Sequence, residues 1–173
     1  MSSAPPHPVF LLDANVFIEA AKRYYGFGIA PGYWDALIIH AGRGPVRSID
    51  RIKLEIIHNN HELETWVNAN FHGYFESTNQ QDVISAYSRV MAWTQAQKQY
   101  SANAQAEFAR GADGWLIAHA LAKRYVVVTE ELYEPTNKKK IKIPNVCRAA
   151  QIPSINTFNM LHQLGVKLTL PHP

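Results

Sequence analysis

The sequence has almost no cysteine, no long hydrophobic run and no basic leader. Its single cysteine, Cys147, leaves no internal disulfide to form and suits a reducing compartment. No apolar run approaches the roughly 20 residues that a membrane-spanning helix needs. The first residues, MSSAPPHP, carry neither a basic start nor an apolar segment, so we expect no signal peptide. We therefore expect a cytoplasmic protein with no membrane partner.

Charged residues are also sparse, at 18% of the 173 residues. Lys and Arg number 17 against 14 Asp and Glu, which gives a formal net charge of +3. This excess permits binding to a polyanion but does not require it. The hydrophobic content of 47% is enough for a sizeable core. We expect residues 1–7 to form a flexible tail and residues 8–173 to form a single domain.

Short apolar runs alternate with stretches of helical spacing. The unbroken run Val9–Leu12 is typical of a strand buried on both faces, and Tyr125–Thr129 is the strongest strand candidate. Weaker strands are expected at 46–49 and 152–156, with a loop or short strand at 71–78. Helices are predicted at 16–24, 33–40, 51–59, 62–70, 81–100, 113–124, 145–151 and 157–164. This alternation predicts right-handed crossovers, a parallel central sheet and a three-layer α/β/α architecture.

Acidic residues stand where several of these elements begin or end. They are Asp13, Glu55, Asp113, Glu130 and Glu131. If the first and fourth strands are neighbours, their carboxyl ends meet at a topological switch point, where α/β sheets bind ligands. Carboxylates gathered there repel one another unless a cation joins them. Oxygen ligands favour Mg²⁺ or Mn²⁺ over Zn²⁺ as that cation.

Each acid also has a purely structural interpretation. Asp13 and Asp113 stand where an aspartate caps a helix N-terminus. Glu55 fits a solvated helix surface, and Glu130 and Glu131 fit an ordinary loop after a strand. The choice between these readings depends on whether the acids converge in the fold.

Four motifs give the sequence a resemblance to a known family. They are LLDANVFIE around Asp13, SIDRIKLEI around Glu55, ADGWLIAHALA around Asp113 and VVVTEEL around Glu131. In these, and in their order, the chain resembles the PIN-domain nucleases, the fold of the VapC-type toxins. It resembles more closely a PIN-like branch designated DUF4411, through SIDRIKLE followed by an ELETW-like helix and through the ending IKIPNVCRAAQIPSINTFNML. The resemblance covers nearly the whole chain.

The resemblance implies a three-layer PIN-like fold and a Mg²⁺- or Mn²⁺-dependent endoribonuclease. Such a protein is commonly the toxin of a type II toxin–antitoxin pair. The implied partners are an RNA substrate, an antitoxin protein and a second copy in a homodimer. The alternative is a catalytically degenerate PIN module that binds RNA or a protein partner without cleaving.

The resemblance also implies roles for individual residues. Asp13, Glu55 and Asp113 match the three near-invariant acids of the family, and Asn15 matches a supporting polar residue. Thr129 matches the Ser or Thr that precedes the fourth acid. That acid is Glu131 by spacing, with Glu130 as the alternative. Direct or water-mediated metal ligands are then Asp13, Asp113 and Glu131 or Glu130, with Glu55 completing the catalytic cluster.

One dense basic segment follows the fourth acid. Its members Lys138, Lys139, Lys140 and Lys142 are candidates for binding RNA phosphates. The alternative for this segment is a solvated charged loop without a binding role.

Overall fold

A five-stranded sheet forms the centre of the protein. The computed structural model describes residues 8–58 and 60–170, so the predicted tail at 1–7 lies outside the described residues. The strands are β1 (Phe10–Leu12), β2 (Val46–Ile49), β3 (Phe75–Glu76), β4 (Val126–Val128) and β5 (Ser154–Ile155). They are arranged in the order β3-β2-β1-β4-β5, and every pair is parallel. The predicted α/β class with a parallel sheet is confirmed.

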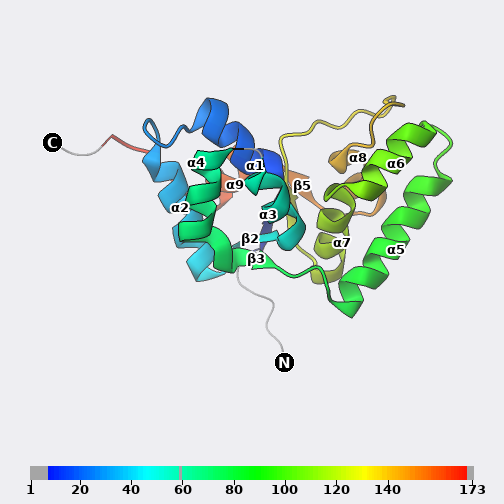
Figure 1. Cartoon of the computed structure of the whole chain (residues 1–173), viewed down its shortest axis with the longest axis horizontal. Coiled ribbons are helices and arrows are strands. Elements are labelled where there is room, and N and C mark those ends of the chain that lie inside the picture. Colours follow the sequence, from blue (N-terminus) through cyan, green and yellow to red (C-terminus); the bar gives the residue numbers. More distant parts are fainter. Residues whose placement is uncertain (1–7, 59, 171–173) are drawn as a thin grey trace.

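The helices cover both faces of this sheet, which gives the three layers (Figure 1). They are α1 (Ala14–Glu19) with its π-helical continuation η1 (Ala20–Tyr24), α2 (Pro31–Arg43), α3 (Asp50–Ile57), α4 (His61–Trp66) with η2 (Val67–Phe71) and η3 (His72–Tyr74), α5 (Gln81–Ala96), α6 (Ala102–Arg110), α7 (Asp113–Lys123), α8 (Ile143–Ala149) and α9 (Thr157–Gln163). Among them, α3 contacts both α1 and α4, while α7 contacts α5, α6 and α8. Within the described residues, no helix is both long and apolar enough to cross a membrane.

The central strand β1 is the most completely buried element. Phe10, Leu11 and Leu12 are all at most 1% exposed, because helices cover both faces and β2 and β4 flank both edges. That environment explains why the sequence shows an unbroken apolar run here instead of an alternating one. The register pairs Leu12 with Val128, so β1 and β4 end side by side.

The predicted helix at 81–100 ends four residues early, and a separate helix follows it. Helix α5 ends at Ala96, and α6 begins after Ser101, whose hydroxyl accepts the Ala104 N–H at 3.1 Å. The Gln105 side chain then donates to the Thr94 carbonyl at 3.1 Å and ties the two helices together. The Gln- and Ala-rich composition here is compatible with helix throughout, so the break depends on this cap and on the tertiary contact.

Polar side-chain contacts of Glu76 attach the edge strand β3 to α7. The Glu76 carboxylate lies 2.7 Å from Nε2 of His119, which is fully buried, and 3.4 Å from Nε of Arg47. The Tyr125 hydroxyl donates to the same carboxylate at 3.4 Å. Burial raises the pKa of Glu76, but His119 and Arg47 outweigh burial and leave the pKa below its ordinary value. Arg47, a basic residue close to the sheet edge, therefore has a structural role.

Gly114 allows α5 and α6 to pack closely against the start of α7. A Cβ atom at this position would lie 2.7 Å from the Met91 side chain, 3.2 Å from Tyr87 and 3.3 Å from Phe108. These distances are shorter than normal van der Waals contact, so only glycine fits without rearrangement. Because Gly114 follows Asp113 directly, this packing also fixes where Asp113 lies.

We predict that Gly114→Ala destabilises the protein by about 1 kcal/mol, the low end of the range for overpacking, because the closest atom is the movable end of the Met91 side chain. Gly73→Ala is the matched control, because a Cβ there meets nothing within 4 Å. Urea denaturation of the two variants and the parent measures both effects. Equal stability of the two variants would show that the packing around Gly114 is looser than described.

Candidate active site

The carboxyl ends of β1 and β4 meet at Asp13 and Thr129. The Asp13 N–H donates to the Val128 carbonyl at 3.0 Å, which continues the pairing of the two strands. The Thr129 hydroxyl donates to Oδ2 of Asp13 at 2.9 Å, and the Ala14 N–H donates to Oδ1 at 2.7 Å. Asp13 is the N-cap residue of α1 and is only 2% exposed. It therefore caps its helix and is also a buried carboxylate held in one orientation.

Asp113 opens α7 but does not cap it. Ala112 stands at the cap position, and no side chain completes the cap. In the parts of the chain that the structure describes, no hydrogen bond to the Asp113 carboxylate is found. Burial, followed by the charges of Glu131 and Glu55, raises the pKa of Asp113 to about 6 from the ordinary value of 3.8. Capping is thus excluded as the explanation for this aspartate.

The mutual electrostatic effects join four carboxylates into one group. Burial and then the charges of Asp113 and Glu131 hold the pKa of Asp13 well above its ordinary value. Glu55 is exposed on α3, and partial desolvation raises its pKa; Lys140 opposes this effect, and the charge of Glu131 adds to it. We call Asp13, Glu55, Asp113 and Glu131 the acidic cluster. The four predicted catalytic acids therefore form one electrostatically connected group, which begins with Asp13 at the carboxyl ends of β1 and β4.

Lys140 is the cation that balances this cluster. Its ammonium group pairs with one oxygen of Glu131, and the Ile143 N–H donates to the other oxygen at 2.8 Å. Burial alone would lower the pKa of Lys140, but Glu131, Asp113 and Asp13 raise it. The basic segment thus folds back over the acids that precede it in the chain.

The other predicted lysines lie elsewhere. Lys142 is 3.5 Å from the Glu134 carboxylate, and Lys138 and Lys139 are exposed on the same loop. The Asn137 side chain shapes this loop by accepting the Lys139 and Lys140 N–H groups at 3.0 and 2.9 Å. Of the four lysines, Lys140 is the one that joins the acidic cluster.

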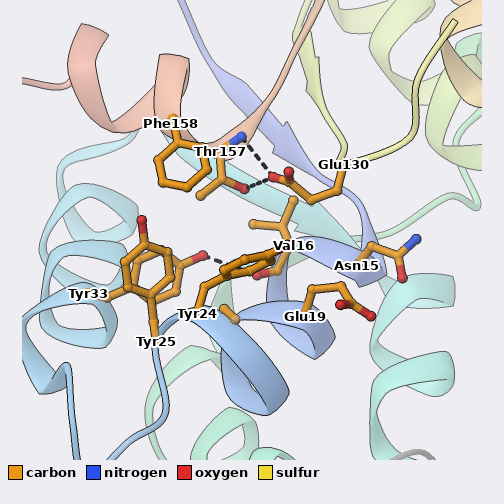
Figure 2. Close-up of a pocket in the computed structure, with 10 residues that line it drawn as sticks. Asn15, Val16, Glu19, Tyr24, Tyr25, Tyr33, Glu130, Thr157 and Phe158 are labelled. Atoms are coloured by element: carbon orange, nitrogen blue, oxygen red, sulfur yellow. Dashed lines mark hydrogen bonds between the residues drawn. The ribbon is translucent and has the colours of Figure 1, made fainter.

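Glu130 points away from the cluster toward α9 (Figure 2). One of its oxygens accepts the Thr157 N–H at 3.0 Å and also the Thr157 hydroxyl. Its charge contributes, after burial, to the raised pKa of Tyr25. Asn15 is half-buried and lines the same small pocket as Glu130. The structure thus separates the two adjacent glutamates, with Glu131 in the cluster and Glu130 bound to Thr157.

The acidic cluster has the donor chemistry of a divalent-cation site but not a ready-made geometry. Over residues 8–58 and 60–170, no three His, Cys, Asp or Glu side chains stand in a ready-made metal-holding arrangement. The chemistry of the donors nevertheless fits a hard cation, because the group consists of carboxylate oxygens. Burial and mutual repulsion raise the pKa of three of them, and a bound cation would relieve that repulsion.

A groove adjoins the cluster on the side of α3 and α6. It has a cavity volume of about 470 Å³, and both Glu55 and Asp113 line it. The groove is also lined by three side chains that can donate hydrogen bonds to a phosphate, namely Arg51, His58 and Arg110. The sequence patterns did not single out Arg110, because its placement beside Asp113 depends on how α6 turns into α7.

The sequence model of the family described as Domain of unknown function (DUF4411) matches residues 10–168. The chain belongs to this family. No curated protein matches the sequence significantly. The DUF4411 match spans all five strands and the whole acidic cluster, so the described site lies within the family region.

The raised pKa of Asp113 predicts that the metal-free DUF4411 protein loses folding stability as the pH rises. The folded state binds the Asp113 proton more tightly than the unfolded state does. Stability from this group is therefore complete below about pH 4 and is lost as the pH rises through about 6. Asp113→Asn removes the charge and should stabilise the protein above pH 6, by at most about 3 kcal/mol for a shift of roughly two units.

Thermal denaturation in EDTA between pH 4 and pH 8 measures this effect. The advantage of Asp113→Asn should grow across that window, whereas the exposed Asp35→Asn control should show no such trend. A constant difference at all pH values would contradict the assigned pKa shift.

The two adjacent glutamates should respond differently to substitution. Glu130→Gln weakens the charge-assisted bonds to Thr157 and should cost about 1 kcal/mol of stability, with any stabilisation by Mn²⁺ retained. Glu131→Gln should instead reduce the stabilisation by Mn²⁺, because it removes a carboxylate from the acidic cluster. Melting temperatures with and without Mn²⁺ separate the two effects. The reverse pattern would assign the fourth acid to Glu130.

Proposed function

We propose that this DUF4411 protein is a divalent-metal-dependent endoribonuclease with a PIN-like active site. The observation that carries the proposal is that Asp13, at the switch point between β1 and β4, interacts electrostatically with Asp113 and Glu131, and that these two interact with Glu55. These residues come from four separate motifs, and the charges of the cluster affect one another. The resemblance of the same four motifs to PIN-domain nucleases supports this assignment.

In this proposal Asp13, Asp113 and Glu131 hold Mg²⁺ or Mn²⁺, directly or through water, and Glu55 completes the cluster. The bound ion supplies Lewis-acid stabilisation of the phosphodiester and a lowered pKa of bound water. We assign Glu131 as the fourth acid because its charge raises the pKa of both Asp13 and Asp113. The carboxylate of Glu130 instead accepts a hydrogen bond from Thr157.

The protein groups contribute orientation and proton transfer. The Thr129 hydroxyl and the Ala14 N–H hold the Asp13 carboxylate in one orientation. The carboxylate is therefore already oriented before substrate binds. One of the carboxylates of the acidic cluster is the proposed acceptor of a proton from the attacking water.

The biological setting follows from the resemblance. We propose that the protein is the toxin of a type II toxin–antitoxin pair, with an antitoxin protein as its partner and a homodimer as its assembly. Expression of the chain in bacteria with and without the product of the neighbouring gene tests this setting independently of the chemistry.

The second candidate is a degenerate PIN module that binds RNA or a protein without cutting. The observation that favours it is Lys140, which already neutralises part of the acidic cluster without a metal ion. RNA affinity that is unaffected by EDTA, together with an absence of cleavage products, would support this alternative.

We predict that Asp13→Asn lowers the Mg²⁺- or Mn²⁺-dependent rate of RNA cleavage by at least about 100-fold, because it removes a charge that stabilises the ion. An asparagine keeps the size of the side chain and an oxygen for the Ala14 N–H, so the fold should persist. Single-turnover cleavage over a metal titration, with melting temperatures measured in parallel, gives both quantities.

The matched control is Asp35→Asn, an exposed change of the same kind on α2. It should leave the cleavage rate at the parental level. An Asp13→Asn protein that cuts as fast as the parent would overturn the proposed active site.

A further inference from the structure

The groove beside the acidic cluster presents positive charge to a site that is otherwise negative. It lies between α3 and the turn from α6 into α7 and shares Glu55 and Asp113 with the cluster. An RNA strand that reaches the cluster must bring its phosphates close to four carboxylates. Cations on the flank of the cluster are needed to offset that repulsion.

Two of the groove's basic residues have no competing partner. Arg110 and His58 are exposed, and neither side chain has a hydrogen bond or an ion pair anywhere in the described parts of the chain. Both line the groove together with Glu55 and Asp113, yet neither forms an ion pair with them. Their N–H groups are therefore available to an incoming anion.

Arg51 is held in place on the same wall. Its guanidinium carbon lies 4.1 Å from the centre of the Trp115 ring, and its Nε donates to the Thr78 hydroxyl at 3.1 Å. These two contacts fix the plane of the guanidinium, while no acceptor in the described residues bonds to its terminal nitrogens. A fixed arginine loses little entropy when it binds a phosphate.

The lysine segment is less available for this purpose. Lys140 is paired with Glu131, and Lys142 is paired with Glu134. Binding of a phosphate by either lysine would compete with an existing ion pair. Arg110 and His58 have no such competition, so the structure favours the groove as the path of the backbone.

We propose that Arg51, His58 and Arg110 bind the phosphodiester backbone of single-stranded RNA and guide it to the acidic cluster. This inference rests on the proposed nuclease function and names the path of its substrate. The cavity volume of about 470 Å³ falls within the roughly 300–1,000 Å³ typical of small-ligand sites, so the groove has room for a short length of one strand. Leu54, 57% exposed on the same wall, offers an apolar contact to a base or ribose.

The test measures binding of a short, unstructured, fluorescein-labelled RNA by anisotropy in EDTA, where metal-dependent cleavage does not interfere. Arg110→Ala should weaken binding roughly three- to tenfold, and the slope of log affinity against log salt should fall by about 0.7, the value for one lost phosphate contact on a single strand. The loss should be the same for different RNA sequences, because the backbone carries no sequence information.

Arg89→Ala is the matched control. Arg89 is exposed on α5, has no polar partner in the described residues and does not line the groove, and its loss changes the net charge equally. It should leave both the affinity and the salt slope near the parental values. Because Arg110 has no structural contact, unchanged melting temperatures are expected for both variants.

The outcomes separate this inference from the proposed function. Parental affinity and slope in Arg110→Ala, or equal losses in both variants, would overturn the groove assignment even if the protein cleaves RNA. An absence of RNA binding by the parent would also overturn it. Groove-dependent binding without any Mg²⁺- or Mn²⁺-dependent cleavage would support the groove and contradict the nuclease.

Discussion

The pairing of β1 with β4 at their carboxyl ends is the constraint on which the site depends. The Asp13 N–H bonds to Val128, and the Thr129 hydroxyl bonds to the Asp13 carboxylate, so backbone and side chain both join the two strands. Leu12 and Val128 are completely buried behind this junction, which prevents either strand from sliding. A shift of one residue would break the hydrogen bond from the Asp13 N–H to Val128 and separate the Asp13 carboxylate from the Thr129 hydroxyl. The orientation of the first acid is therefore maintained by the core of the protein.

Placing four carboxylates around this junction has an energetic cost. Burial and repulsion make ionisation of Asp13 and Asp113 unfavourable, and Lys140 compensates for only part of that effect. Such a cost persists in a protein when other packing is strong enough to support it. Here the tight packing around Gly114 holds Asp113 against α5 and α6, so the aspartate cannot move away from its neighbours.

Patterns local in the sequence predicted the parts of this fold that depend on local physics. The apolar runs predicted β1 and β4, because a strand buried on both faces consists of unbroken apolar residues. Strand β2 was predicted with its observed bounds, Val46–Ile49. The break between α5 and α6 was not predicted, because it depends on the contact of Gln105 with the preceding helix. The same limit applies to the site. The sequence predicted that Asp13 and Asp113 lie at the carboxyl edge of the sheet. The hydrogen bonds from Thr157 to Glu130 and from Ile143 to Glu131 are what distinguish the two glutamates.

The two outer strands of the sheet have a consequence for assembly. Strands β3 and β5 each contain only two residues. The Glu76 carboxylate of β3 is paired with His119 of α7. Edges this short offer few unpaired backbone groups, so another chain gains little by adding a strand to the sheet. Any stable association of this protein must therefore be built from contacts between helices and loops, and fibril-like stacking through the sheet is disfavoured by the architecture itself.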